Sequence, residues 1–137
     1  MGKGERQKVA VASILVLKPE ILVIDEPTTG QDWSGIQSMM SLVDTLHKSG
    51  TTIVMITHDM DVVARYAQRV VVLCKGEVKL DGPTREVFEH RQILGEAYVT
   101  RPQIVELADK LRAKGLTQLA LTEEELSGLV IDTLEGE

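Results

Sequence analysis

The sequence predicts an α/β fold with a mostly parallel sheet and a small helical C-terminal appendix. Two short apolar runs, ILVI at 21–24 and TTIVMI at 51–56, lack polar alternation, which is typical of strands buried on both faces. RVVVL, KGE and VKLDG follow one another between 69 and 82 and predict a hairpin. Segments with helical spacing lie between these strands, and this alternation of strand and helix favours a parallel sheet.

The helices of the core are predicted from apolar spacing and from residues that start or stop a helix. A first helix is expected over 5–17, before Pro19. A second follows Ile36 and ends at Gly50, and Asp59 opens a third, shorter one. The apolar stripe of the second helix consists of Met39, Met40, Val43 and Leu46.

Beyond Gly82 the sequence changes to short helices. Pro83 opens one, and Thr122, with three glutamates after it, caps the last. A helix between them, ended by Gly115, is predicted from the stripe Ile104, Leu107, Ala108 and Leu111. We therefore expect an α/β core at 1–82 and a helical extension at 83–137.

The composition indicates one buried core and a reducing compartment. The chain has 137 residues, of which 43% are hydrophobic. Cys74 is the single cysteine, so no internal disulfide forms. The longest largely apolar run, Val9–Leu17, is half of the roughly 18 residues that span a bilayer. We expect a cytoplasmic protein.

The net charge of −6 is concentrated in the helical extension, where 11 acidic residues accompany 6 basic ones. Only 3% of the residues are aromatic. An acidic surface repels phosphate backbones, and so few aromatic rings provide no platform for stacked bases. We expect no nucleic-acid partner.

Asp25 and Glu26 directly follow the first apolar strand, so both carboxylates emerge at its carboxyl end. Ligands of open α/β sheets bind at that place. One carboxylate there can hold Mg²⁺, and the other can orient or deprotonate a water molecule. Two solvated acids in a loop are the simpler interpretation of an isolated Asp-Glu pair.

Thr57, His58 and Asp59 follow the second apolar strand. If the two strands are parallel neighbours, His58 lies beside Asp25 and Glu26. Its imidazole can then hydrogen-bond a phosphate oxygen or the attacking water. The alternative is that His58 and Asp59 only cap the next helix.

The sequence predicts a phosphate site at the start of the chain, in Gly2, Lys3, Gly4 and Glu5. Free backbone N–H groups at a helix N-terminus bind phosphate, and neighbouring glycines allow close approach. Lys3 adds a positive charge. A frayed terminus with glycines of no consequence explains the same residues.

Together, MGKGERQKVAVA, ILVIDEP, TTGQD and ITHD resemble the C-terminal half of the nucleotide-binding ATPase subunits of ABC transporters, over residues 1–82. The first segment resembles the signature motif with its helix, and the second the Walker B strand. The third resembles the D-loop, and His58 in the fourth resembles the switch histidine. The TTGQD sequence and the helical extension are most similar to those of the energy-coupling-factor type, the cobalt or vitamin importers.

The resemblance implies a P-loop NTPase fold that binds ATP with Mg²⁺, and it implies roles for the candidate residues. Asp25 would help to hold Mg²⁺, Glu26 would be the general base, and His58 would contact the γ-phosphate. Asp32 would lie at the interface with a second ATPase subunit. The ATP bound to that subunit would be faced by four residues of this chain, Gly2, Lys3, Gly4 and Glu5. Transmembrane transporter subunits and a place on the inner face of the cell membrane are implied as well.

The chain departs from the family pattern in three ways. Gly2 replaces the serine usual in the signature motif, so one hydroxyl contact to phosphate is lost. Lys3 replaces the second-to-last glycine of that motif and Glu5 replaces its glutamine, changes that we associate with a subgroup rather than with inactivity. The phosphate-binding loop G-x-x-x-x-G-K-[ST] does not occur in the sequence. The resemblance thus implies a fragment that begins inside the signature motif and does not hydrolyse ATP alone. Such a fragment exposes a sheet edge and apolar surface, so we expect it to self-associate.

Two alternatives stay open. One is a soluble ABC-type ATPase of chromosome maintenance or repair, which the absence of sustained heptads disfavours. The other is a non-catalytic assembly or dimerisation module with a degenerate nucleotide fold. The intact Asp25, Glu26 and His58 oppose the second alternative, whereas the missing phosphate loop favours it.

Overall fold

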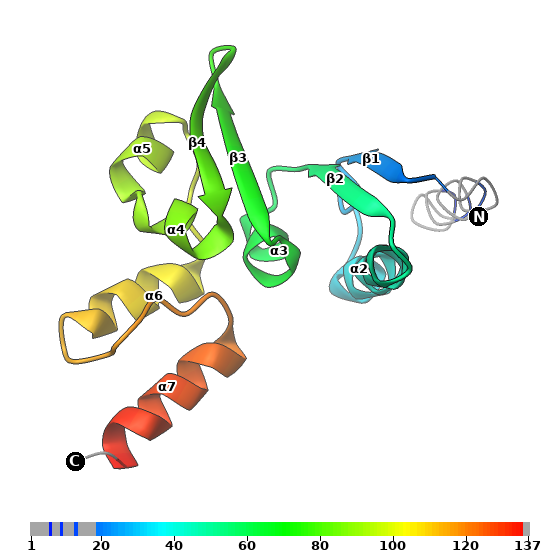
Figure 1. Cartoon of the computed structure of the whole chain (residues 1–137). Helices are drawn as coiled ribbons and strands as arrows, with labels where there is room; N and C mark the ends of the chain where they lie inside the picture. The colour runs from blue at the N-terminus through cyan, green and yellow to red at the C-terminus, as the bar shows by residue number, and fades with distance from the viewer. Residues whose placement is uncertain (1–5, 7–8, 10–12, 14–18, 136–137) are drawn as a thin grey trace. The chain divides into compact units, whose positions relative to one another are not determined.

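The computed structural model describes residues 6, 9, 13 and 19–135 (Figure 1). The phosphate site predicted at Gly2, Lys3, Gly4 and Glu5 lies outside the described residues. The chain divides into two compact units, Met1–His58 and Asp59–Glu137. Each unit has its own sheet and its own helices.

The first unit is a β-α-β element. Strand β1 (Ile21–Asp25) pairs in parallel with β2 (Thr52–Ile56), and α2 (Trp33–Lys48) connects them. The parallel pairing expected from the sequence is confirmed, and Figure 1 shows α2 beside the strand pair. The predicted stripe of α2 is buried, and the helix ends before Gly50, whose φ of 101° suits glycine.

Burial of β1 and β2 on both faces was predicted, and this is wrong for the described structure. Leu22 and Ile24 on one face of β1 are buried, but the other face of the sheet is open to solvent. Its exposed fractions are 62% for Ile21, 60% for Val23, 45% for Val54 and 54% for Ile56. Parallel sheets normally carry helices on both faces. Among the described residues of this unit, α2 is the helix that connects the two strands, and one helix covers one face of the sheet.

The second unit is built on the predicted hairpin. Strands β3 (Arg69–Cys74) and β4 (Glu77–Pro83) pair antiparallel, and Lys75 and Gly76 form the turn with φ of 52° and 79°. Positive φ at both positions is typical of the turns that match strand twist. The helices are α3 (Met60–Tyr66), α4 (Thr84–Glu89), α5 (Arg91–Glu96), α6 (Gln103–Arg112) and α7 (Glu123–Glu135).

The core of this unit joins the hairpin to the helices that precede and follow it. Its most buried large side chains include Phe88, Leu94 and Leu119, and Val72 of β3 belongs to the same cluster. In Figure 1, α4 follows directly on the hairpin, and it contacts both β3 and β4. No described helix is long and apolar enough to cross a bilayer.

One residue of the stripe predicted for α6 is misplaced. Leu107 is 48% exposed, whereas Val105 is fully buried together with Ala108. Ile104 and Leu111 pack against the same core. The buried face of α6 is therefore rotated toward Val105 relative to the prediction.

Candidate active site

Glu26 and His58 meet at the carboxyl end of the β1–β2 pair. The backbone N–H of Glu26 donates a 2.8 Å hydrogen bond to the carbonyl oxygen of Ile56, the last residue of β2. His58 follows two residues later, and its Nδ1 lies 2.7 Å from Oε1 of Glu26. Because parallel strands end at the same edge of a sheet, the residues after them come together. The predicted proximity of His58 to Glu26 is confirmed.

A tight turn after β1 adds Thr29 to this pair. Glu26 has a φ of 45°, in the left-handed region that is uncommon outside glycine. The Thr29 N–H donates to the Glu26 carbonyl oxygen at 3.3 Å, and the Thr29 hydroxyl donates to Oε2 of Glu26 at 2.9 Å. The sequence analysis missed Thr29. The sequence signal for this contact is a hydroxyl residue three positions after an acid, in a segment rich in turn residues.

The charge state of Glu26 follows from these contacts. The hydrogen bond with His58 holds the pKa of Glu26 below its ordinary value of 4.5. Partial burial raises this pKa, and the hydrogen bond from the Thr29 hydroxyl lowers it. The Glu26 side chain is 34% exposed, and that of His58 is 81% exposed. Glu26 is therefore a carboxylate at neutral pH, and solvent reaches it.

Asp25 is exposed at the end of β1, next to this pair. Mg²⁺ in nucleotide sites uses one or two carboxylates and completes its shell with water and phosphate oxygens. The Mg²⁺ role implied for Asp25 stays a prediction. Within the described ranges, no group of three or more His, Cys, Asp and Glu could hold a metal ion.

Asp32 caps helix α2. Its Oδ1 accepts a 2.8 Å hydrogen bond from the Gly35 N–H. A Cβ on Gly35 would lie 3.0 Å from that oxygen and 2.8 Å from Oε1 of Gln31, so glycine leaves room for the cap. The interface role implied for Asp32 stays a prediction.

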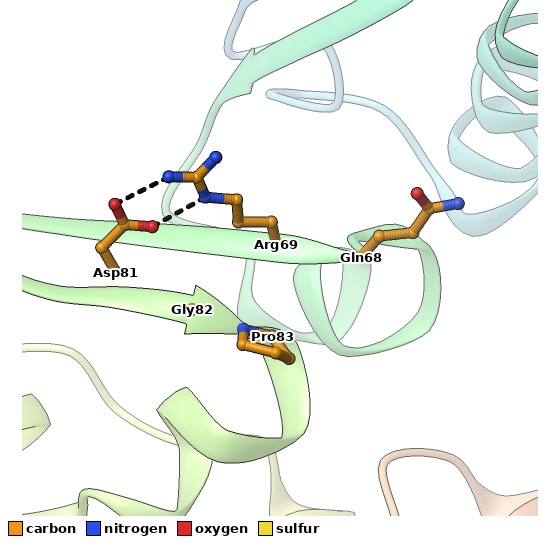
Figure 2. A pocket seen from close by; sticks show the side chains of 5 residues that line it. All are labelled: Gln68, Arg69, Asp81, Gly82 and Pro83. Atoms are coloured by element: carbon orange, nitrogen blue, oxygen red, sulfur yellow. Dashed lines mark hydrogen bonds and ion pairs between the residues drawn. The ribbon is translucent and has the colours of Figure 1, made fainter.

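The second unit has an open hollow of about 310 Å³, lined by Gln68, Arg69, Asp81, Gly82 and Pro83 (Figure 2). Arg69 is its cation, and it is already paired with Asp81. Nε and Nη2 of Arg69 lie 2.8 Å from the two carboxylate oxygens of Asp81. The guanidinium holds the pKa of Asp81 below its ordinary value. The hollow lacks the strand-end carboxylates and the histidine of the Glu26 site.

Similar proteins occur among curated sequences. No protein-family model matches the chain. A putative ABC transporter ATP-binding protein of Methanosarcina acetivorans is 47% identical over 116 residues, which cover 85% of this chain and 19% of that protein. The energy-coupling factor transporter ATP-binding protein EcfA2 of Enterococcus faecalis is 42% identical over 135 residues, 96% of this chain and 47% of that protein. The chain is a homologue of the ABC transporter ATP-binding proteins.

A solved structure supports the same relationship. The chain matches cbiO1 of Clostridium perfringens, part of the ABC transporter complex cbiONQ, with 35% identity and a TM-score of 0.60. The match covers 80% of this chain and 44% of that chain. The expected α/β fold of the P-loop NTPase class is confirmed. The chain spans less than half the length of the curated relatives it matches.

Proposed function

We propose that this ABC ATPase homologue carries the water-activating part of the ATP site of an importer of the energy-coupling-factor type. One observation carries the proposal. An ionised, solvent-reachable Glu26 is hydrogen-bonded to His58 at the end of a parallel strand pair. Carboxylate and imidazole at that edge are the groups that water activation and phosphate contact require.

Each residue has a distinct task in this mechanism. Glu26 orients the attacking water or accepts its proton, and the exposed ring of His58 donates a hydrogen bond to a γ-phosphate oxygen. Asp25 is the residue that would hold Mg²⁺, which neutralises charge on the phosphates when bound. Positioning and charge stabilisation supply most of the catalysis in phosphoryl transfer.

We further propose a two-subunit arrangement. In it, Asp32 lies near a second ATPase subunit, and transmembrane subunits are the other partners, on the cytoplasmic face of the membrane. The ATP of the second subunit is contacted by Gly2, Lys3, Gly4 and Glu5. Metal-ion or vitamin uptake is the proposed class of transport. The names of EcfA2 and of cbiO1, part of a transporter complex, support these assignments.

The absent phosphate loop limits what the 137 residues do by themselves. The loop supplies the backbone N–H groups and the lysine that hold the β- and γ-phosphates, and no G-x-x-x-x-G-K-[ST] occurs in the sequence. We propose that this chain alone does not hydrolyse ATP. The same observation favours the second candidate function, a non-catalytic assembly module.

A chimaera separates the two candidates. The part of Enterococcus faecalis EcfA2 that this chain does not cover is joined ahead of it, and ATP hydrolysis is measured for the chain and for the chimaera. We expect the chimaera to hydrolyse ATP and the chain alone not to. In a Glu26→Gln chimaera we expect the hydrolysis rate to fall at least about 100-fold, while calorimetry still shows binding of Mg²⁺-ATP. Undiminished hydrolysis by Glu26→Gln would refute the role of Glu26. An inactive chimaera that binds no nucleotide would favour the assembly module.

A further inference from the structure

A second open hollow of the Asp59–Glu137 unit lies between the tip of the β3–β4 hairpin and the C-terminal end of α5. It has a volume of about 430 Å³. The two sides meet where Sγ of Cys74 lies 4.0 Å from the carbonyl oxygen of Glu96. Glu26 and His58 belong to the other unit, so this hollow is distinct from their site. Its lining residues are Cys74, Lys75, Lys79, Gly95, Glu96 and Tyr98.

Tyr98 occupies a position at which glycine is usual. The Tyr98 N–H donates to the Gly95 carbonyl oxygen at 3.1 Å, and the Val99 N–H donates to the Leu94 carbonyl oxygen at 2.9 Å. These two bonds form a Schellman motif at the end of α5, whose left-handed residue is most often glycine. Tyr98 has a φ of 59° and is 86% exposed, so packing of its ring does not offset the backbone strain.

Gly95 shows the opposite departure. It lies within α5, where glycine is less favourable than alanine because it loses more conformational freedom on folding. A Cβ on Gly95 would meet nothing within 4 Å, so no neighbouring atom requires a glycine there. The helix would be more stable with a side chain at position 95 and glycine at position 98. Departures of this kind gather at functional sites, and these two line one hollow.

Lys75 is the unpaired cation of the hollow. It forms part of the hairpin turn, with a φ of 52°, and has no ion-pair partner among the residues that the structure describes. Nζ of Lys79 lies 2.6 Å from Oε2 of Glu77, which balances its charge. Oε1 of Glu96 accepts a 3.1 Å hydrogen bond from Nε2 of Gln92. An anionic group that enters the hollow therefore has Lys75 as its direct partner.

We propose that this hollow docks a segment of a partner polypeptide in which an acidic side chain stands next to an aromatic one. The carboxylate pairs with Lys75, and the aromatic ring lies over Gly95 against the ring of Tyr98. Contacts between two aromatic rings add to the effect of burying their apolar area. Tyrosine is also enriched among the residues that carry most of the binding energy at protein interfaces.

The shape of the hollow favours a polypeptide over a small molecule. Small-molecule sites enclose most of the surface of their ligand, whereas this hollow is open. A polypeptide makes further contacts around the hollow, so it does not have to be enclosed. Its acidic and aromatic side chains then supply the charge and the flat surface that Lys75, Gly95 and Tyr98 fit.

The test uses this chain and a capped hexapeptide that alternates aspartate with para-fluorophenylalanine. Fluorine NMR of the peptide measures its Kd for the chain, because the fluorine line broadens on binding even when the affinity is low. The variants are Tyr98→Gly, Gly95→Leu and Lys75→Gln. Tyr98→Gly and Gly95→Leu both suit α5 better than the native residues, so neither is expected to lower the urea midpoint of unfolding.

Each variant has a matched control away from the hollow. Gly128→Leu fills open space beside another helical glycine, and Lys110→Gln removes another exposed lysine. We expect the Kd to rise at least about tenfold in Tyr98→Gly and in Gly95→Leu. In Lys75→Gln we expect a rise of about threefold, because an exposed ion pair contributes less. Both controls are expected to leave the Kd unchanged.

Changes in the probe complete the test. A hexapeptide with asparagine in place of aspartate is expected to lose affinity for the wild-type chain, and to lose less for Lys75→Gln. Absence of fluorine broadening with the wild-type chain would overturn the docking site, and so would an unchanged Kd in Tyr98→Gly or Gly95→Leu. If para-fluorobenzoate bound as tightly as the hexapeptide, the hollow would be a site for small aromatic acids, and the polypeptide partner would be refuted.

Discussion

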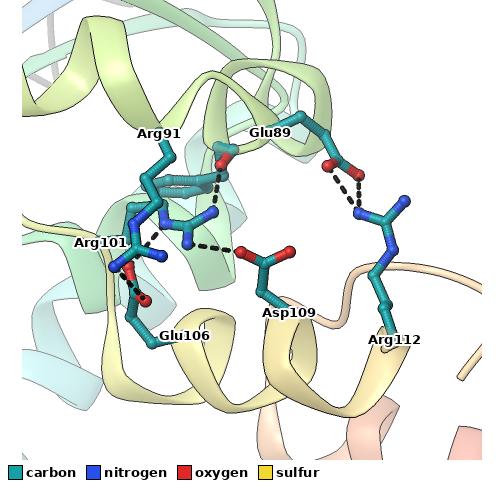
Figure 3. A network of polar contacts seen from close by, with 7 residues as sticks. Glu89, Arg91, Arg101, Glu106, Asp109 and Arg112 are labelled. Atoms are coloured by element: carbon teal, nitrogen blue, oxygen red, sulfur yellow. Dashed lines mark hydrogen bonds and ion pairs between the residues drawn. The ribbon is translucent and has the colours of Figure 1, made fainter. Parts of the chain in front are cut away.

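The guanidinium of Arg101 donates a 3.0 Å hydrogen bond from Nη1 to the carbonyl oxygen of Phe88, and its side chain is only 3% exposed (Figure 3). Its Nε and Nη2 lie 2.8 Å from the carboxylates of Glu106 and Asp109. Phe88 belongs to α4, and both acids belong to α6. One planar group with several donors in a fixed fork thus joins two helices.

Replacement of Arg101 by leucine is expected to lower the free energy of unfolding by about 3 kcal/mol. The change leaves the Glu106 and Asp109 carboxylates without their buried counter-ion, and breaking a buried pair from one side is costly. Arg101→Lys retains the charge but cannot reach three acceptors at once, so we expect it to recover only part of the loss. Urea unfolding followed by circular dichroism measures both variants.

Arg91 supplies the matched control for this prediction. It also faces Glu106, but at 3.6 Å and from a side chain that is 70% exposed. Because exposed ion pairs contribute little, Arg91→Leu is expected to change the free energy of unfolding by less than about 0.5 kcal/mol. Equal losses from Arg91→Leu and Arg101→Leu would show that burial of the guanidinium is not what matters.

The same cluster predicts a dependence of stability on pH. Hydrogen bonds from Arg101 hold the pKa values of Glu106 and Asp109 below their ordinary values of 4.5 and 3.8. The unfolded chain therefore binds these protons more readily than the folded chain does. Their contribution is fully present above the ordinary values and is lost as the pH falls through the lowered ones.

Urea midpoints measured between pH 7 and pH 2.5 test this dependence. The wild-type midpoint is expected to fall as the pH drops below about 4, and the Glu106→Gln/Asp109→Asn variant is expected to fall less steeply from a lower starting value. If the urea midpoints of the two proteins fell equally steeply with pH, the acid sensitivity would come from carboxylates other than Glu106 and Asp109.

Local signals in the sequence predicted the strand-end site and most of the elements. Apolar runs predicted β1 and β2, and residues that follow parallel strands meet for topological reasons, so the proximity of Glu26 and His58 followed. The cap predicted at Thr122 is present, because its Oγ1 accepts a 3.2 Å hydrogen bond from the Glu125 N–H. These features depend on residues close in sequence or on strand order.

Other features escaped prediction because they depend on packing. A six-residue helix such as α5 has too little length for periodicity to show. Arg101 precedes α6 and bonds to Phe88 and Asp109, which no helical spacing pairs with it. The open face of β1 and β2 was also missed, because an apolar run without alternation does not say which segments cover it.

Asp32 is expected to contribute to stability through its cap on α2. Asp32→Ala removes the oxygen that accepts from the Gly35 N–H and is expected to cost about 1 kcal/mol, whereas Asp32→Asn retains an acceptor and most of the stability. Thermal or urea unfolding measures the difference. Asp44→Ala, which breaks an exposed pair with Lys48 in the same helix, is the control and is expected to cost less than about 0.5 kcal/mol.

The open face of the β1–β2 sheet is expected to make the chain self-associate. Val23 and Val54 lie opposite each other in the register and are 60% and 45% exposed, between Ile21 and Ile56 on the same face. Contiguous exposed apolar side chains on a sheet favour association, because each contact removes them from water.

Sedimentation equilibrium over a range of concentrations is expected to show species larger than the monomer, and Val54→Lys is expected to shift the distribution toward the monomer. Val71→Lys gives the comparison, because Val71 is exposed to a similar extent, 49%, on the hairpin of the other unit. The explanation fails if the wild-type chain is monomeric at high concentration, or if Val71→Lys disperses the assemblies as well as Val54→Lys does.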